Sequence, residues 1–121
     1  MKIKEFKSKN IEKKLVRNPN SNKGDYGHVL IVAGNLGFGG AALLSSKGVL
    51  ASGAGLATLA TRKEHLSAAL TYCPEVMTKT VESISDLENH LPNKTVICIG
   101  PGLGRNLSLI HISEPTRLTC I

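Results

Sequence analysis

Short apolar runs alternate along this chain with segments that carry helix signals. Val29–Ala33 (VLIVA) is apolar at every position and rich in β-branched residues, which predicts a strand covered on both faces. Strands are also expected at Leu56–Thr61 and Thr95–Ile99 (TVICI), and Tyr72–Val81 holds a loop around Pro74 with room for a third strand before the last one.

Helices are predicted between these runs. Ala41–Ser52 has small residues on most faces, Glu64–Leu70 is short, and a third helix through Leu91 is expected to start at a capping box formed by Ser85 and Glu88. Strands and helices that alternate in this way are joined by βαβ crossovers. The pattern therefore predicts one α/β domain with a mainly parallel sheet.

Two glycine-rich loops follow predicted strands, at Gly34–Gly40 (GNLGFGG) and Gly100–Gly104 (GPGLG). In parallel sheets ligands bind beyond the carboxyl ends of the strands, where glycines let backbone N–H groups approach an anion. A helix that starts near Ala41 would add its positive dipole end. The alternative is that the glycines only permit tight turns between a strand and the next segment. The presence of two such loops after two strands favours a ligand-binding site.

Gly37–Ala42 also matches the dinucleotide fingerprint G-x-G-x-x-A, but the match is weak. Gly34–Leu36 separate it from the strand end, and the next strand ends in Thr61 and Arg62 without the ribose-binding acid. A G-x-x-x-x-G-K-[ST] phosphate loop is absent from the sequence.

The net charge of +6 is concentrated at the start of the chain. Met1–Lys23 has eight Lys and Arg against two acids, whereas Gly24–Asn106 has six of each. We interpret residues 1–22 as a solvated basic leader rather than a phosphate-binding arm, because no aromatic residues beyond Phe6 are interleaved for stacking on bases. We expect no nucleic-acid partner.

Other sequence features argue against a membrane span, a disulfide framework and a metal site. Val29–Ser46 is uncharged for eighteen residues but includes Asn35 and four glycines. The three cysteines have no C-x-x-C spacing, which suits a reducing cytoplasm. The histidines have no metal-ligand spacing and are expected at the surface: His28, His65, His90 and His111. Glu75 either faces the rim with the glycine loops or is an exposed loop acid.

Four motifs together resemble, in order and spacing, the amino-terminal part of the NAD(P)H-hydrate dehydratases. They are NKGDYGHVLIVAG (22–34), GGAALLSSKGVLASGAGLATLAT (39–61), PEVM (74–77) and IGPGLGR (99–105). The resemblance covers about residues 17–106. Asn22 and Phe38-Gly39 depart mildly from the residues that are common in the family. The resemblance implies a ribokinase-like three-layer α/β/α fold with residues 23–106 as its amino-terminal part.

The resemblance also implies an activity. Enzymes of this family use ADP or ATP with Mg²⁺ to repair hydrated NADH or NADPH, by phosphorylation of the ring hydroxyl and elimination of phosphate. The loops Gly39–Ala42 and Gly100–Gly104 resemble the contacts of the family with the hydrated cofactor, and Ala41, Gly102 and Gly104 are the expected substrate-binding residues. Relatives are often tetramers. The alternatives are another ribokinase-like kinase of a small alcohol and a non-catalytic nucleotide-binding module.

The catalytic aspartate of the family lies in a G-x-G-D loop towards the carboxyl terminus, and no such motif occurs here. The chain is therefore expected to hold roughly the first half of the fold and to be inactive by itself. Residues 107–117 (LSLIHISEPTR) resemble a translated sequencing-library adapter. We interpret residues 107–121 as a non-native tail.

We predict that uninterrupted genomic DNA departs from this sequence at or near Asn106 and continues into a G-x-G-D loop. The reason is that the family pattern and the adapter resemblance meet at that residue. Long-read sequencing across the locus checks this, and recovery of residues 107–121 in chromosomal DNA would contradict it. The protein encoded there is called the genomic full-length protein below.

Overall fold

A computed structural model of the protein describes residues 8, 12 and 16–105. Much of the predicted basic leader, and all of residues 107–121, lie outside the described residues. The elements in chain order are η1 (Lys23–Tyr26), β1 (His28–Val32), α2 (Gly39–Ala51), β2 (Leu56–Thr61), η2 (Lys63–His65), α3 (Leu66–Tyr72), β3 (Met77–Thr80), α4 (Ile84–His90) and β4 (Val96–Ile99).

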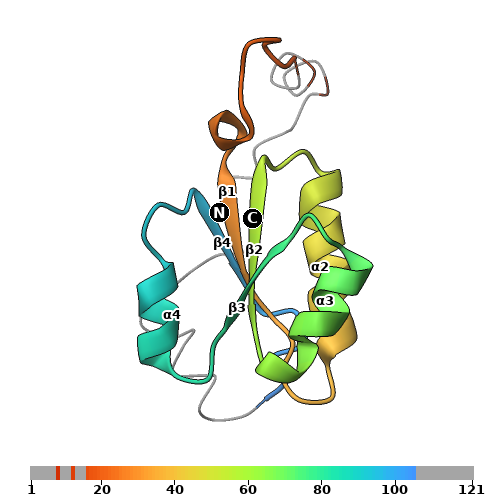
Figure 1. Ribbon diagram of the computed structural model, residues 1–121, viewed down its shortest axis with the longest axis vertical. Coiled ribbons are helices and arrows are strands. Elements are labelled where there is room, and N and C mark those ends of the chain that lie inside the picture. The colour runs from red at the N-terminus through yellow and green to blue at the C-terminus, as the bar shows by residue number, and fades with distance from the viewer. Residues whose placement is uncertain (1–7, 9–11, 13–15, 106–121) are drawn as a thin grey trace.

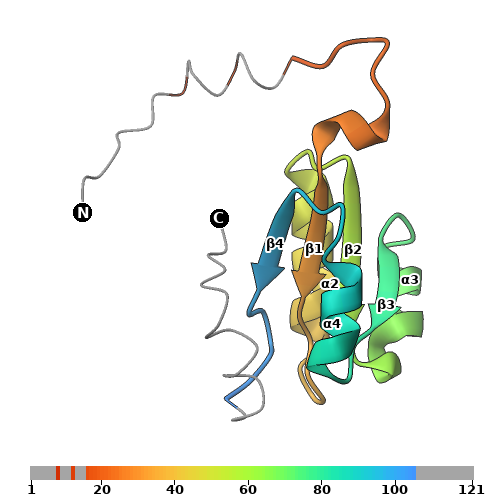
Figure 2. The same ribbon diagram turned by 90° about the vertical axis from the view of Figure 1, so that its left-hand side faces the viewer.

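The four strands form one parallel sheet in the order β3-β2-β1-β4. Helices α2 and α3 cover one face of this sheet and α4 covers the other (Figure 1). The view onto the sheet shows all four strands running in the same direction, with β4 at one edge and β3 at the other (Figure 2). The predicted α/β/α layering and parallel sheet are confirmed.

The alternation of side chains along β1 explains why the run Val29–Ala33, which forms most of this strand, is apolar at every position. Ile31 and Ala33 lie in the core beneath α2 and α3, whereas Leu30 and Val32 lie in the core beneath α4. Successive strand residues point to opposite faces of a sheet, so a central strand covered on both sides needs an unbroken apolar run. β1 is such a strand, and the uncharged stretch 29–46 is divided between β1, a loop and α2. Within the described part of the chain, no helix is long and apolar enough to cross a membrane.

The capping box of the last helix lies two residues earlier than predicted. The Ser83 Oγ accepts a hydrogen bond from the Asp86 backbone N–H at 3.2 Å, and the Asp86 carboxylate accepts one from the Ser83 N–H at 3.0 Å. Hydrogen bonds to the Asp86 carboxylate, first from the Glu82 N–H and then from Ser83, lower the pKa of Asp86. Ser83 has the extended backbone that an N-cap needs, so α4 begins at Ile84 and the predicted box at Ser85 and Glu88 was wrong.

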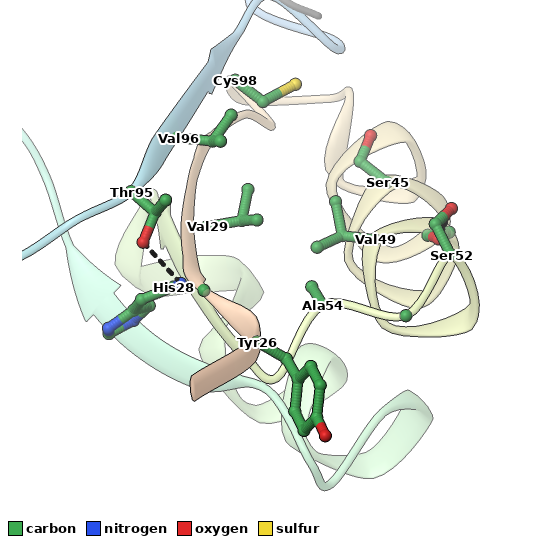
Figure 3. A pocket seen from close by; sticks show the side chains of 13 residues that line it. Tyr26, His28, Val29, Ser45, Val49, Ser52, Ala54, Thr95, Val96 and Cys98 are labelled. Carbon is green, nitrogen blue, oxygen red and sulfur yellow. Dashed lines mark hydrogen bonds between the residues drawn. The ribbon is translucent and has the colours of Figure 1, made fainter. Parts of the chain in front are cut away.

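A groove of about 620 Å³ opens at the amino ends of β1 and β4, against the last turns of α2. Figure 3 shows Val29 from β1, Val96 from β4 and Val49 from α2 around this groove, with the His28 backbone N–H donating to Thr95 Oγ1 at 3.1 Å. In the described part of the chain α2 lies over β1 and β2, and Val96 and Cys98 of the edge strand β4 line the groove beside it.

His28 at the edge of this groove predicts a pH dependence of stability. Burial, and secondarily the charge of Lys94, lower the pKa of His28 from its ordinary value of 6.5. At pH values below 6.5 the unfolded chain binds this proton more readily than the folded chain does. The contribution of His28 to stability is therefore fully present above pH 6.5 and is lost as the pH falls towards the pKa of the folded state. We expect the melting temperature to fall less between about pH 7.5 and pH 5.5 in His28→Gln than in the wild type. Equal falls in thermal melts would contradict this.

Candidate substrate-binding rim

The two glycine loops lie side by side because β1 and β4 are neighbours in the sheet. Each loop leaves the carboxyl end of its strand, and two backbone hydrogen bonds join them directly. The Gly34 N–H donates to the Pro101 carbonyl at 2.9 Å, and the Asn35 N–H donates to the Gly102 carbonyl at 2.8 Å. This paired edge, Gly34–Ala41 with Gly100–Gly104, is called the rim below. The loops that the sequence analysis singled out separately therefore form one surface.

Gly102 lies directly against the start of α2. A Cβ built on Gly102 would lie 2.8 Å from both the Ala41 Cβ and the Phe38 carbonyl oxygen, and the residue has a φ of +65°. Both observations require glycine, because a side chain would clash and the left-handed backbone disfavours other residues. Gly102 thus brings the second loop into contact with Ala41 of the first.

Gly104 differs from Gly102 in having open space beside it. Its φ is +77°, but among the described residues the nearest atom outside its chain neighbours to a Cβ built there is Asn35 Nδ2, at 3.9 Å. The structure therefore brings the three predicted substrate contacts to one rim: Ala41 and Gly102 touch, and Gly104 borders the open side. Which ligand atoms they meet stays a prediction.

The first turn of α2 adds to the electrostatics of the rim. This helix has thirteen residues, begins at Gly39 and has no acidic residue in its first turn. Phe38 at its N-cap makes no side-chain capping hydrogen bond. The positive end of the helix dipole therefore faces the rim without a side-chain acceptor, which favours negative charge there.

Three polar residues beneath the rim were missed as site residues in the sequence analysis. Asn35 accepts a hydrogen bond from Arg62 Nε through its Oδ1 at 3.3 Å, and its backbone carbonyl lies 3.0 Å from His65 Nε2. Arg62 and His65 follow β2, so they reach Asn35 only because β2 pairs with β1. The available signal was that Asn35 and Arg62 each come within three residues of the end of a strand, on the same edge of the sheet.

The structure decides between the two alternatives for Glu75 and corrects the expectation for two histidines. Glu75 is an exposed loop acid, as the second alternative predicted; it precedes β3 and so lies at the amino edge of the parallel sheet, away from the rim. His28 and His65 are half-buried and hydrogen-bonded rather than free surface residues, His28 through Nε2 to Thr58 Oγ1 at 2.7 Å. His111 lies outside the described residues. Among residues 8, 12 and 16–105, no group of three or more His, Cys, Asp or Glu could hold a metal ion.

The chain is similar in sequence to enzymes that repair hydrated nicotinamide cofactors. The family model of the NAD(P)H-hydrate dehydratases matches residues 29–117. An ADP-dependent (S)-NAD(P)H-hydrate dehydratase of Listeria monocytogenes is 46% identical over 88 residues, which are 73% of this chain and 32% of that protein. A bifunctional NAD(P)H-hydrate repair enzyme of Coxiella burnetii is 43% identical over 86 residues, 71% of this chain and 18% of that protein. The family match runs past Asn106, so it marks no boundary there.

The fold is similar to solved structures as well. An ADP/ATP-dependent NAD(P)H-hydrate dehydratase from Bacillus subtilis, co-crystallised with ATP/Mg²⁺, matches with a TM-score of 0.74 and 28% identity, over 84% of this chain and 37% of that one. A ribokinase-like superfamily protein from Enterococcus faecalis matches with a TM-score of 0.72 and 33% identity, over 80% of this chain and 34% of that one. The chain spans about a third of the length of these structures, rather than the half expected from its motifs.

The family match includes both glycine loops and three of the four strands in full, and the two structural matches given above extend over 80% and 84% of the chain. Sequence motifs, sheet order and paired loops thus agree, and the chain belongs to the NAD(P)H-hydrate dehydratase family, with a ribokinase-like fold.

Proposed function

We propose that the genomic full-length protein restores NADH and NADPH from their (S)-hydrates with ADP or ATP, and that residues 23–106 provide its binding surface for the hydrated cofactor. The observation that carries this proposal is the rim, where two glycine loops are hydrogen-bonded to each other at the carboxyl edge of the sheet. This edge is where parallel α/β sheets bind their ligands.

The rim suits a flat, anionic nucleotide. Ala41, Gly102 and Gly104 have side chains no larger than a methyl group, so a nicotinamide ring can lie close to the backbone. The uncapped amino end of α2 attracts the pyrophosphate of the same ligand. In this proposal the segment binds and orients the hydrated ring, which lowers the entropic cost of the later steps.

The proton transfer and the nucleotide site are assigned to the part of the protein beyond this segment. Neither Gly34–Gly40 nor Gly100–Gly104 contains an Asp or Glu that could act as the general base. Among the described residues no group of three or more His, Cys, Asp or Glu could hold a metal ion, so no resident metal is assigned to this segment. We propose that Mg²⁺ enters with ADP or ATP, and no step is assigned to it here.

The remaining parts of the proposal concern the cell and the assembly. We propose a cytoplasmic enzyme, since three cysteines without paired spacing suit a reducing compartment. A homo-tetramer is proposed on the family resemblance. We propose no nucleic-acid partner, because basic and acidic residues balance between Gly24 and Asn106.

Recovery of nicotinamide absorbance after adding ADP or ATP with Mg²⁺ to hydrated NADH tests the function. We expect turnover by the genomic full-length protein and none by the 121-residue chain, which lacks the expected base. Phosphorylation of a small alcohol without action on hydrated cofactor would favour the kinase alternative. A genomic reading frame that ends without a G-x-G-D loop would favour the nucleotide-binding module.

Substitution of Gly104 tests where the ligand lies. In the genomic full-length protein, Gly104→Val should raise KM for hydrated NADH by about tenfold or more, because a branched side chain would occupy the open space at the rim. Gly104→Ala adds a smaller, unbranched side chain, which also fits the left-handed backbone at a lower cost, so its KM should rise less. Steady-state kinetics of the two variants measure the difference, and wild-type kinetics in Gly104→Val would place the site elsewhere.

A further inference from the structure

We propose that Asn35 is a positioning residue that holds the two loops of the rim in register for the hydrated cofactor. This inference rests on the proposed function, but the residue itself does not need to touch the ligand. Asn35 lies in the loop after β1, half-buried between the loop after β4 and the turn after β2. It is the residue at which three chain segments meet.

The polar atoms of Asn35 are all engaged. Towards the second loop, its N–H donates to the Gly102 carbonyl at 2.8 Å and its Nδ2 donates to the Leu103 carbonyl at 3.2 Å. On the other side, its Oδ1 accepts from the Leu36 N–H at 2.9 Å and from Arg62 Nε at 3.3 Å. Its backbone carbonyl oxygen lies 3.0 Å from His65 Nε2. The residue thus fixes the second loop relative to both the first loop and β2.

Only a side-chain amide can make this set of bonds at this reach. A carboxylate offers acceptors alone, and a hydroxyl on one carbon is too short to bond Leu36 and Leu103 together. The Arg62 guanidinium can only donate hydrogen bonds, so the amide atom of Asn35 that faces Arg62 must be the oxygen Oδ1. The amide nitrogen is thereby directed at the Leu103 carbonyl, and the orientation of the side chain follows from its partners.

The bond to Leu103 bears on substrate binding because of its position. Leu103 separates Gly102, which contacts Ala41, from Gly104, whose open side faces Asn35 Nδ2. Loss of this bond frees the end of the second loop while the hydrophobic core remains intact. The expected consequence is weaker binding of the hydrated cofactor, with little change in the chemical step, since the proposed base lies outside this segment.

Asn35→Asp in the genomic full-length protein removes this bond and adds a negative charge. The aspartate keeps the size of the side chain and the acceptor for Leu36 and Arg62, and it loses the donor to Leu103. We expect KM for hydrated NADH to rise by about tenfold and kcat to change by less than about threefold. Asn35→Ser can still accept from the Leu36 N–H and also loses the Leu103 bond, so it should show the same split without an added charge. Asn89→Asp, on the exposed surface of α4, adds the same charge far from the rim and should leave KM and kcat unchanged.

Amide hydrogen exchange provides a readout that does not depend on activity. The N–H groups of Gly34 and Asn35 donate across the two loops, so both should exchange at least about tenfold faster in Asn35→Asp and Asn35→Ser than in the wild type. Wild-type KM and wild-type exchange in both variants would overturn the positioning role. A wild-type protein that ignores hydrated cofactor would refute the proposed function instead, while the exchange rates would still decide whether Asn35 holds the loops together.

Discussion

Gly102→Ala in the genomic full-length protein should raise KM for hydrated NADH by about 30-fold or more, which corresponds to about 2 kcal/mol of binding free energy. The added methyl group would lie 2.8 Å from the Ala41 Cβ and from the Phe38 carbonyl oxygen. Neither neighbour can yield without moving the start of α2, because one is the first turn of that helix and the other is backbone. The second loop must therefore shift away from the first, and the rim opens.

Gly104→Ala is the matched control for this substitution. The two glycines lie in the same loop, and their φ values are +65° and +77°, so both variants carry a similar cost of left-handed backbone, about 1 kcal/mol. Only Gly102 has a neighbour within clashing distance. Steady-state kinetics should show a much larger rise of KM in Gly102→Ala. Equal effects in the two variants would mean that backbone strain, not loop contact, matters here.

Gly34→Ala should destabilise the folded protein by about 3 kcal/mol or more. Gly34 is buried at the end of β1, with a φ of +78°. An added Cβ would lie 2.7 Å from the Ala42 Cβ and 2.8 Å from Thr61 Oγ1, which itself donates to the Gly34 carbonyl at 3.0 Å. Ala42 and Thr61 are buried in α2 and β2, so relief of the clash would separate the helix from the sheet.

Gly37→Ala separates overpacking from backbone strain at this position. Gly37 lies in the same loop with a φ of +82°, but nothing lies within 4 Å of a Cβ built there. Since the described residues leave space there, its cost should be about 1 kcal/mol, that of the left-handed backbone. Urea unfolding of both variants measures the two losses of unfolding free energy. A loss in Gly34→Ala no larger than that in Gly37→Ala would show that α2 and β2 adjust freely around the loop.

The order of elements in this chain could be predicted from local patterns. The unbroken apolar run at Val29–Ala33 identifies a strand buried on both faces, and alternation of strands with helices leads to a parallel sheet. The glycine clusters after two strands identify both loops of the rim. These inferences succeed because periodicity and glycine content report on the immediate surroundings of each residue. Boundaries were less certain, as the capping box at Ser83 and Asp86 shows, since several polar residues near a helix start can compete for the N-cap.

Contacts between distant segments were decided only by the tertiary structure. The glycine loops after β1 and β4 could be predicted from the local sequence, but only the strand order β3-β2-β1-β4 made them neighbours. The same order put Arg62 and His65 beside Asn35, and the position of each residue after a strand does not show that they meet. The physical reason is that strand order depends on which crossovers bury the most apolar surface together. The total buried apolar surface depends on the whole domain, so the residues that come into contact share no pattern that could be recognised in their local sequence.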